Sequence, residues 1–461
     1  MAAFFAGLAA VYLPVPVLSG PPAAMLVIAG LALGILVAPL EIALGALSFS
    51  FLAASCVRLQ LSFELYRWIF LGGSAAVLAL RFFLRRPGRS AAPSRFQFLM
   101  ILFLMISTAS LLNTVSLRLT ALKLGAVVCL LFVTSQAALR LVDAWGPAAA
   151  RRLVLGLALH PAGIILLAAA GGWISFGPPV TLQGRFSGYL GNPNTWALLG
   201  ITLLPWTICP LVEKTRSPAR QWVAAAALVI LANTLLSTGS RAGLLGAAAV
   251  AALFGLVHAS RKVAVMVTLG SVLLAAQALA RPEVFSDLAQ QYLYKHSRGQ
   301  GDFLQSRAKP WSRFQDDFYR RPWLGLGFGA TSERQAEWSA DYRGGAGTVE
   351  TGSSFWMVLI QVGALGAAPL FLAILLLLAQ AGRFAWRVRD PWFTGVYGST
   401  LALAINAVFE GWLLSPGNFA GIYFWLQCFL LSAVMSRFRP AAARQVHFGW
   451  PATGPVAAGR A

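Results

Sequence analysis

Two arginines lie in short stretches that contain glycines and small polar residues, between apolar segments of this 461-residue chain. Arg241 ends the stretch STGSR (237–241), and Arg185 lies within QGRFSGYLGNPN (183–194). Glycines and small hydroxyl residues let backbones approach closely and add donors, and a guanidinium can grip two phosphate oxygens at once. Both stretches therefore predict a site for an anionic group such as phosphate. For Arg241 the alternative is an interfacial anchor that reaches the lipid headgroups.

The stretch Asn192-Pro193-Asn194 is typical of a helix start, because Asn is a good N-cap and Pro suits the first turn. A capped turn explains it fully. In the functional interpretation, this helix N-terminus and Arg185 together favour an anion. We expect Asn192, Asn194 and Ser240 to shape the site.

Further charged candidates lie towards the C-terminus. Arg307 follows Ser306 in a polar stretch, and Glu350 lies just before an apolar segment. Glu350 is interpreted either as a general base or as a solvated carboxylate near a helix N-terminus. Glu410, at the end of another apolar segment, is the weaker candidate for a base.

The elements that must position these residues are membrane helices. Of the residues, 58% are hydrophobic and 11% are charged, whereas a soluble chain carries about 25% charge. Apolar runs of about 18 residues or more recur, which is the length of a membrane-spanning helix. The predicted fold class is all-α: a polytopic membrane protein of about 12–14 transmembrane helices with one long periplasmic loop.

About 14 spans are expected, although five prolines between residues 14 and 39 leave the first three poorly defined. Their approximate ranges are 4–19, 22–39, 40–57, 65–84, 97–113, 119–141, 152–175, 194–213, 221–238, 241–259, 262–280, 354–380, 394–413 and 417–436. The spans 221–238 and 241–259 are predicted to form a hairpin with Arg241 at its tip.

The net charge of +21 is explained by basic loops on one side of the membrane rather than by a nucleic-acid partner, because no basic and aromatic module is visible. Clusters of Arg and Lys recur at every second loop, near 81–95, 140–152, 214–220, 261–262, 383–389 and 437–444. These loops and both termini are therefore predicted to be cytoplasmic. The N-terminus lacks the features of a removable signal peptide.

The chain divides into transmembrane helices with short loops (1–280), a partly helical periplasmic loop (281–353), C-terminal transmembrane helices (354–436) and a basic cytoplasmic tail expected to be disordered (437–461). In the long loop, Leu304, Trp311, Phe314 and Phe318 predict an amphipathic helix that could rest on the membrane surface. GLGFG (325–329) is not a nucleotide fingerprint and predicts a mobile lid or a tight turn. The four cysteines are interpreted as small hydrophobic residues, since none has zinc spacing.

The ordered motifs resemble the O-antigen ligase and O-antigen polymerase family of bacterial envelope polysaccharide synthesis. Four stretches carry the resemblance: GRFSGYLGNPNTWA (184–197), LSTGSRAG (236–243), SRAKPWSRFQDDFYRRPWLGLGFG (306–329) and ETGSSFWMVLIQVGALG (350–366). It implies a metal-independent glycosyltransferase of the bacterial inner membrane, with its active site facing the periplasm and no cofactor. Its donors are glycans on undecaprenyl diphosphate. Arg185, Arg241 and, more loosely, Arg307 match the arginines that hold the diphosphate.

One departure bears on the activity. Ligase-like members carry His-Asn where this chain has Gly352 and Ser353, and Glu350 is the nearest candidate base. This favours a polymerase of lipid-linked repeat units, with a flippase and a chain-length regulator as possible partners. The alternative is a ligase that transfers glycan to lipid A-core.

Two other classes of function are compatible with the sequence. A transporter predicts ionisable residues near the middle of the bilayer, where Lys123 and His160 are the few candidates, and a non-catalytic assembly scaffold is the third possibility. The enzyme hypothesis makes one structural prediction: Arg185 and Arg241 should converge at one outer site.

Overall fold

The computed structural model describes residues 48–49, 51–56, 67–68, 71–80, 94–170, 181–182, 185–213, 217–258, 305–330 and 352–438. For 162–170, 182, 305–310 and 313 it describes the backbone alone. The predicted spans 4–19, 22–39 and 262–280 lie outside the described residues. The spans 40–57 and 65–84 are covered in part, with a helix over Leu71–Leu80.

The all-helical prediction is confirmed. Within the described ranges, eight helices are long and apolar enough to cross a membrane. The long helices are α5 (Arg95–Ala109), α6 (Leu117–Trp145), α7 (Ala149–Ala170), α8 (Pro193–Val212), α9 (Pro218–Thr238), α10 (Arg241–His258), α13 (Gln305–Arg320), α15 (Ser354–Val388), α16 (Pro391–Phe409) and α17 (Phe419–Arg437). Three short 3₁₀ helices are η1 (Ser110–Leu112), η2 (Gly146–Ala148) and η3 (Gly188–Leu190). One antiparallel pair joins β1 (Thr181–Leu182) to β2 (Arg185–Phe186).

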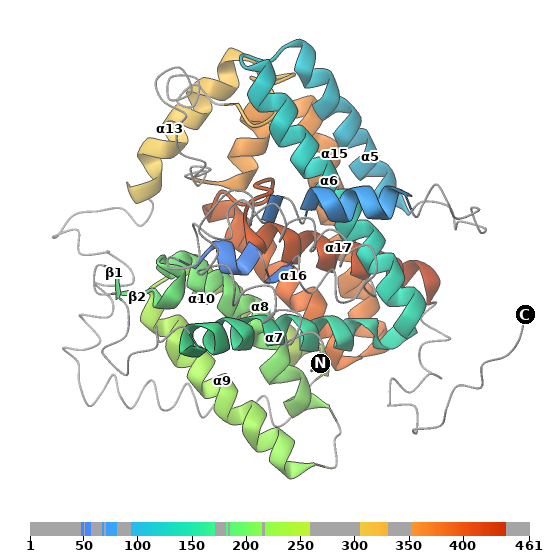
Figure 1. Ribbon diagram of the computed structural model, residues 1–461, viewed down its shortest axis with the longest axis vertical. Helices are drawn as coiled ribbons and strands as arrows, with labels where there is room; N and C mark the ends of the chain where they lie inside the picture. Colours follow the sequence, from blue (N-terminus) through green and yellow to red (C-terminus); the bar gives the residue numbers. More distant parts are fainter. Residues whose placement is uncertain are drawn as a thin grey trace, which may run out of the picture.

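Helix α16 lies at the centre of the bundle, with α8 and α10 on one side and α15 and α17 on the other (Figure 1). Helix α15 packs on α5, α17 on α6, and α9 on the outside of α8. The side chains of α16 and α17 are almost all buried, and Trp412, Tyr423 and Trp425 are among the largest in the core. Helices α5 and α9 expose apolar side chains such as Phe98 and Ile230, which is the surface expected towards lipid.

Helices α9 and α10 depart from the predicted hairpin. They share a tight turn, in which Gly239 has the left-handed conformation that ends α9 (φ 57°). Beyond the turn α9 packs mainly on α8, while α10 packs mainly on α16. The hairpin prediction was wrong because the sequence shows which faces are apolar but not which neighbour covers them.

Helix α15 is interrupted at Gly363, whose backbone is not helical (φ 64°, ψ −175°). An interruption frees N–H and C=O groups of the helix, and in a membrane these groups need partners within the protein. The segment 322–327, which follows α13, supplies them. Leu326 N and Gly327 N donate to the carbonyls of Ile360 and Gln361, at 2.8 and 3.0 Å.

Two further hydrogen bonds complete the pairing of 322–327 with 360–365, which we call the backbone splice. Ala364 N and Leu365 N donate to the carbonyls of Pro322 and Trp323, at 2.7 and 3.2 Å. The splice needs glycine on both sides. A Cβ on Gly325 would lie 2.5 Å from the Gln361 backbone, and one on Gly363 would lie 2.2 Å from the Trp323 backbone.

GLGFG is therefore a buried turn, which confirms the tight-turn alternative of the prediction rather than the mobile lid. Its glycines have φ values of 69°, 108° and 78°, and Leu326, Phe328 and Ala330 are buried. The sequence shows the glycines but not the interrupted helix against which they pack.

The amphipathic helix predicted near Trp311, Phe314 and Phe318 is confirmed as α13. Its apolar face is covered by protein rather than resting on the membrane surface. These three side chains form a small second core with Trp356, Met357, Ile360, Leu326, Ala330 and Val115. In Figure 1, α13 lies beside the beginning of α15.

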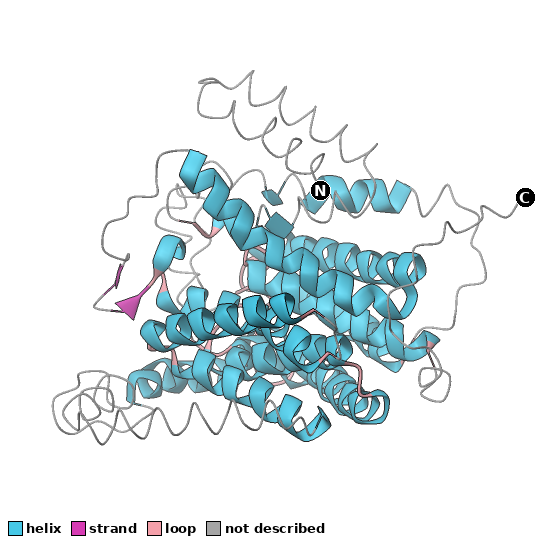
Figure 2. Cartoon of the chain, turned by 90° about the horizontal axis from the view of Figure 1, so that it is seen from below, coloured by secondary structure: helices cyan, strands magenta, loops and turns pink. Residues whose placement is uncertain are grey.

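The helix ends group at two ends of the bundle, as the alternation of basic loops predicted. We call the end that carries the starts of α8 and α15 and the end of α16 the outer end. The opposite end, at which α8 ends and α16 begins, is the inner end. The helices run side by side between them, and the strand pair lies at one edge (Figure 2). That the inner end faces the cytoplasm stays a prediction.

Candidate functional site

Arg185 lies against the turn that precedes Arg241. Its Nε donates to the carbonyl of Thr238 at 2.7 Å. The turn residue Gly239 lies so close that a Cβ there would be 3.2 Å from the Arg185 Nε. The segment of Arg185 therefore meets the turn before Arg241 at the outer end, although 53 residues separate Arg185 from Thr238. That the two guanidiniums converge on one site stays a prediction.

The NPN stretch begins α8 as predicted. The Asn192 side chain accepts a hydrogen bond from Asn194 N at 2.8 Å, and Pro193 occupies the first turn. The capped-turn interpretation is thus confirmed for Asn192. Asn194 does something the sequence did not predict: its Oδ1 accepts from Arg185 Nη2 at 3.1 Å, and its Nδ2 donates to Glu410 Oε1 at 2.9 Å.

Glu410 joins α16 to the beginning of α15. Its backbone carbonyl accepts from both the N–H and the Oγ of Ser354, at 3.2 and 2.6 Å. The Ser354 Oγ in turn accepts from Trp412 N and Leu413 N, at 3.0 and 3.1 Å. We call Arg185, Asn194, Glu410 and Ser354 the outer polar network. It connects β2, α8, α16 and α15, four elements that are distant in sequence.

Arg241 is half-buried and is the first residue of α10. Ser240, before it, is buried: its N–H donates to Thr238 Oγ1 at 3.2 Å, and its Oγ accepts from Gly243 N at 3.4 Å. Ser240 thus caps the helix that carries Arg241. An anion at this position would be stabilised both by the guanidinium charge and by the N-terminus of the helix.

The small residues around Arg241 allow helices to approach closely, as predicted. A Cβ on Gly243 would lie 2.6 Å from the Ala197 Cβ of α8. On the other side of α10, a Cβ on Gly246 would lie 3.2 Å from the Ala402 Cβ of α16. Helix α10 is therefore fitted between α8 and α16, and Arg241 stands at the outer end of this contact.

The other two charged candidates are less fully described. Arg307 lies in the first turn of α13, in a stretch described by its backbone alone. Glu350 lies outside the described residues. The structure does describe Gly352, which has φ 121° and on which a Cβ would lie 2.3 Å from the Phe314 ring. No side chain fits at Gly352 while α13 packs in this way. Ser353 caps α15 by accepting from Trp356 N at 3.5 Å.

This geometry can be compared with known proteins. Residues 226–372 match the family model of the O-antigen ligase. A search of curated proteins finds no match. The O-antigen ligase match confirms the resemblance for three of its four stretches, those at 236–243, 306–329 and 350–366. The family consists of membrane enzymes of polysaccharide synthesis that transfer lipid-linked glycans.

The O-antigen ligase match covers most of α9, then α10, α13 and the broken first half of α15. It includes Arg241, Arg307 and Glu350 but begins after Arg185. The hydrogen bond from Arg185 to Thr238 joins the fourth stretch of the resemblance to the matched region. The outer polar network thus continues the O-antigen ligase region into α8 and α16.

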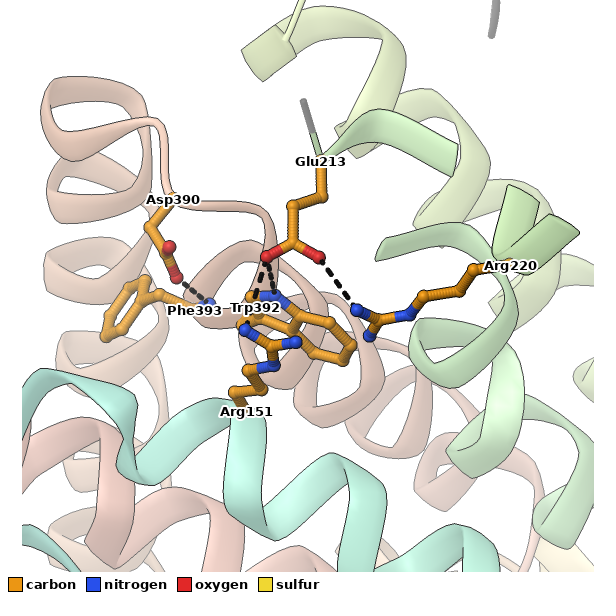
Figure 3. A network of polar contacts seen from close by, with 6 residues as sticks. All are labelled: Arg151, Glu213, Arg220, Asp390, Trp392 and Phe393. Atoms are coloured by element: carbon orange, nitrogen blue, oxygen red, sulfur yellow. Dashed lines mark hydrogen bonds and ion pairs between the residues drawn. The ribbon is translucent and has the colours of Figure 1, made fainter. Parts of the chain in front are cut away.

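A second polar cluster lies at the inner end (Figure 3). Glu213 lies between Arg151 and Arg220, at 3.4 and 3.7 Å, and accepts from Trp392 Nε1 at 3.2 Å. Asp390 caps α16 by accepting from Phe393 N at 2.7 Å. Burial raises the pKa of the Asp390 carboxyl to about 6. These contacts fasten α7, α8, α9 and α16 together, away from the outer polar network.

His160, one of the two residues weighed for a transporter, is buried within the bundle. Its Nδ1 lies 2.7 Å from the Tyr423 hydroxyl and its Nε2 lies 3.1 Å from the Ser48 Oγ. Both ring nitrogens thus have partners, as a histidine with a packing role needs. Lys123 is half-buried on α6, beside Gly329 at the outer end.

Proposed function

We propose that this protein is a membrane glycosyltransferase that polymerises glycan repeat units carried on undecaprenyl diphosphate, with its active site at the outer end of the bundle. In the reaction, an acceptor sugar hydroxyl attacks the anomeric carbon of the donor. The carbon–oxygen bond to the diphosphate breaks, and the diphosphate leaves with the electron pair. The hydroxyl proton passes to a base. The chemistry needs stabilisation of the departing charge and a positioned base.

The hydrogen bond from Arg185 to the turn before Arg241 carries this proposal. It brings two arginine-bearing segments together at the edge of an apolar bundle, beside the N-termini of α8 and α10. A diphosphate attached to a lipid tail would meet such a site directly from the membrane. Two guanidiniums and two helix N-termini all favour the diphosphate anion.

Arg307 and Glu350 complete the proposed site. Helix α13, which carries Arg307, packs on α15. The start of α15 binds Glu410, and this packing therefore supports a role for Arg307 near the outer polar network. Glu350 is four residues before Ser354, and so the chain limits the distance between their Cα atoms to about 14 Å. A base at Glu350 is therefore within reach of the outer polar network. No metal or cofactor is invoked.

Two observations bear on whether the enzyme is a polymerase or a ligase. The description of the matched family favours a ligase that transfers glycan to lipid A-core. Gly352 favours the polymerase, because the packing of Phe314 against it excludes the histidine that ligase-like members carry at this position. The proposed setting is the bacterial inner membrane, with a flippase and a chain-length regulator as partners.

The test compares purified wild-type protein with Arg241→Lys and Arg241→Ala, using a lipid-linked repeat unit as the substrate. Lys keeps the charge but loses the fork that binds two oxygens. We expect Arg241→Lys to impair polymer formation clearly, and Arg241→Ala to slow it about 30- to 1000-fold, equivalent to about 2–4 kcal/mol.

The matched control is Arg152→Ala, which removes an exposed arginine stacked on Trp145 at the inner end. It should leave the rate unchanged. If Arg241→Lys is as active as wild type, Arg241 is an interfacial anchor and the diphosphate site is wrong. If the wild-type protein forms no polymer but transfers glycan to added lipid A-core, the ligase replaces the polymerase.

A further inference from the structure

The orientation of the Asn194 amide is determined by the two charged groups on either side of it. Arg185 can only donate hydrogen bonds, and an ionised Glu410 carboxylate can only accept them. The amide therefore turns its Oδ1 to Arg185 and its Nδ2 to Glu410, as the distances of 3.1 and 2.9 Å record. The reversed amide would face a donor with a donor and an acceptor with an acceptor.

We call the hydrogen-bonded chain from Glu410 through Asn194 to Arg185 the relay. Each of its ends is fixed by backbone contacts. The Glu410 carbonyl is bound twice by Ser354 at the start of α15. Asn194 lies in the capped first turn of α8. On the Arg185 side, the Nε is already bound to the Thr238 carbonyl. The guanidinium is thus held at two of its nitrogens, in a plane set by elements from four parts of the chain.

We propose that Glu410 is a positioning residue that acts through Asn194 to orient the Arg185 guanidinium for a diphosphate. This deepens the proposed function and rests on it. In this role Glu410 holds Asn194 through its Oε1 and is not the base that takes the acceptor proton. The negative charge of Glu410 offsets the positive charge of Arg185 before the substrate arrives. The side of the guanidinium towards the Thr238 turn faces the segment of Arg241.

The experiment is a double-mutant cycle on purified full-length protein, with a lipid-linked repeat unit as donor. Glu410→Ala and Asn194→Ala should each lower kcat/KM about tenfold, mainly through KM for the donor, as expected for the loss of one charge-assisted hydrogen bond. The double variant should lose no more than either single variant, because both changes break the same relay. Glu410→Gln retains an acceptor oxygen and should recover most of the loss.

A base at Glu410 gives opposite results: Glu410→Gln would be as inactive as Glu410→Ala, through kcat, and the effect would multiply with that of Asn194→Ala. Either finding would overturn the proposal. The matched carboxylate control is Asp316→Asn, on an exposed residue of α13, and it should match wild type. If Glu410→Ala lowers the melting temperature in detergent, Glu410→Met keeps the side-chain volume and replaces it in the cycle.

Arg185→Ala separates this proposal from the proposed function. If Arg185→Ala is inactive while Glu410→Ala and Asn194→Ala match wild type, the positioning role alone is wrong. If Arg185→Ala also matches wild type, the diphosphate site itself is wrong.

Discussion

Replacing Gly325 with alanine should loosen the splice that closes the interrupted helix α15. Gly325 has φ 69°, where a Cβ costs roughly 1–2 kcal/mol. The added Cβ would also lie 2.5 Å from the Gln361 carbonyl. Moving it to an ordinary contact needs a shift of about 0.9 Å between the two backbones.

Such a shift stretches the two neighbouring hydrogen bonds, from Leu326 N to the Ile360 carbonyl at 2.8 Å and from Gly327 N to the Gln361 carbonyl at 3.0 Å. Each contributes about 1 kcal/mol net, and more where water cannot replace it. Together with the backbone strain, Gly325→Ala should lower the free energy of unfolding by about 3–4 kcal/mol.

The assay is thermal unfolding of the purified protein in detergent, together with limited proteolysis near 321–330. We expect the melting temperature to fall by about 3–4 °C and cleavage to accelerate. The matched control is Gly255→Ala on α10, where an added Cβ meets nothing within 4 Å. That variant should be as stable as wild type or gain about 0.5–1 kcal/mol. Equal melting temperatures for Gly325→Ala and wild type would refute the splice as a source of stability.

Two further predictions concern the inner end and the topology. Because burial raises the pKa of Asp390 to about 6, the folded state retains a proton that the unfolded state releases near pH 4. The contribution of Asp390 to stability is therefore fully present below pH 4 and is lost as the pH rises through 6. Asn still caps a helix, so melting curves of Asp390→Asn should show a smaller decline between pH 4 and pH 7 and a gain of about 1–3 kcal/mol at pH 7; an unchanged pH dependence would contradict the assignment. In a variant without native cysteines, an impermeant thiol reagent added to spheroplasts should label Leu112→Cys at the outer end and spare Ala219→Cys at the inner end, both exposed positions. The reverse pattern would invert the predicted orientation.

The sequence predicted where the helices begin and end better than it predicted which helices pack together. Helix ends are encoded locally: Asn192 and Pro193 begin α8, and Gly239 ends α9, and each acts through neighbours a few residues away. Hydropathy therefore predicted the starts of the described spans between 97 and 436 to within three residues, whereas α15 continues to Val388, eight residues beyond its predicted end at 380. It could not predict that α9 and α10 separate, since lipid and protein both accept an apolar face.

In the candidate site, too, the sequence indicated single residues better than the contacts between distant residues. Arg185 and Arg241 are candidates because charge between apolar segments is visible in sequence, and the structure brings Arg185 to the turn before Arg241. Glu410 was underrated and Asn194 was assigned only to site shaping. Their relay joins residues 216 positions apart, and no local signal records such a pairing. The one available hint was that both lie at helix ends predicted to share the outer side.

The splice in α15 also constrains how the protein is made. Residues 322–327 leave the ribosome before α15. In the predicted orientation, in which the 281–353 loop is periplasmic, they must cross the membrane before α15 can complete its hydrogen bonds. Until they dock, the carbonyls of Ile360 and Gln361 and the N–H groups of Ala364 and Leu365 have no partners from the segment that later covers them, a cost that hydrocarbon does not relieve. Biogenesis of this helix thus depends on export of the loop that precedes it. A truncation that removes the loop would leave a defective membrane helix rather than a smaller protein.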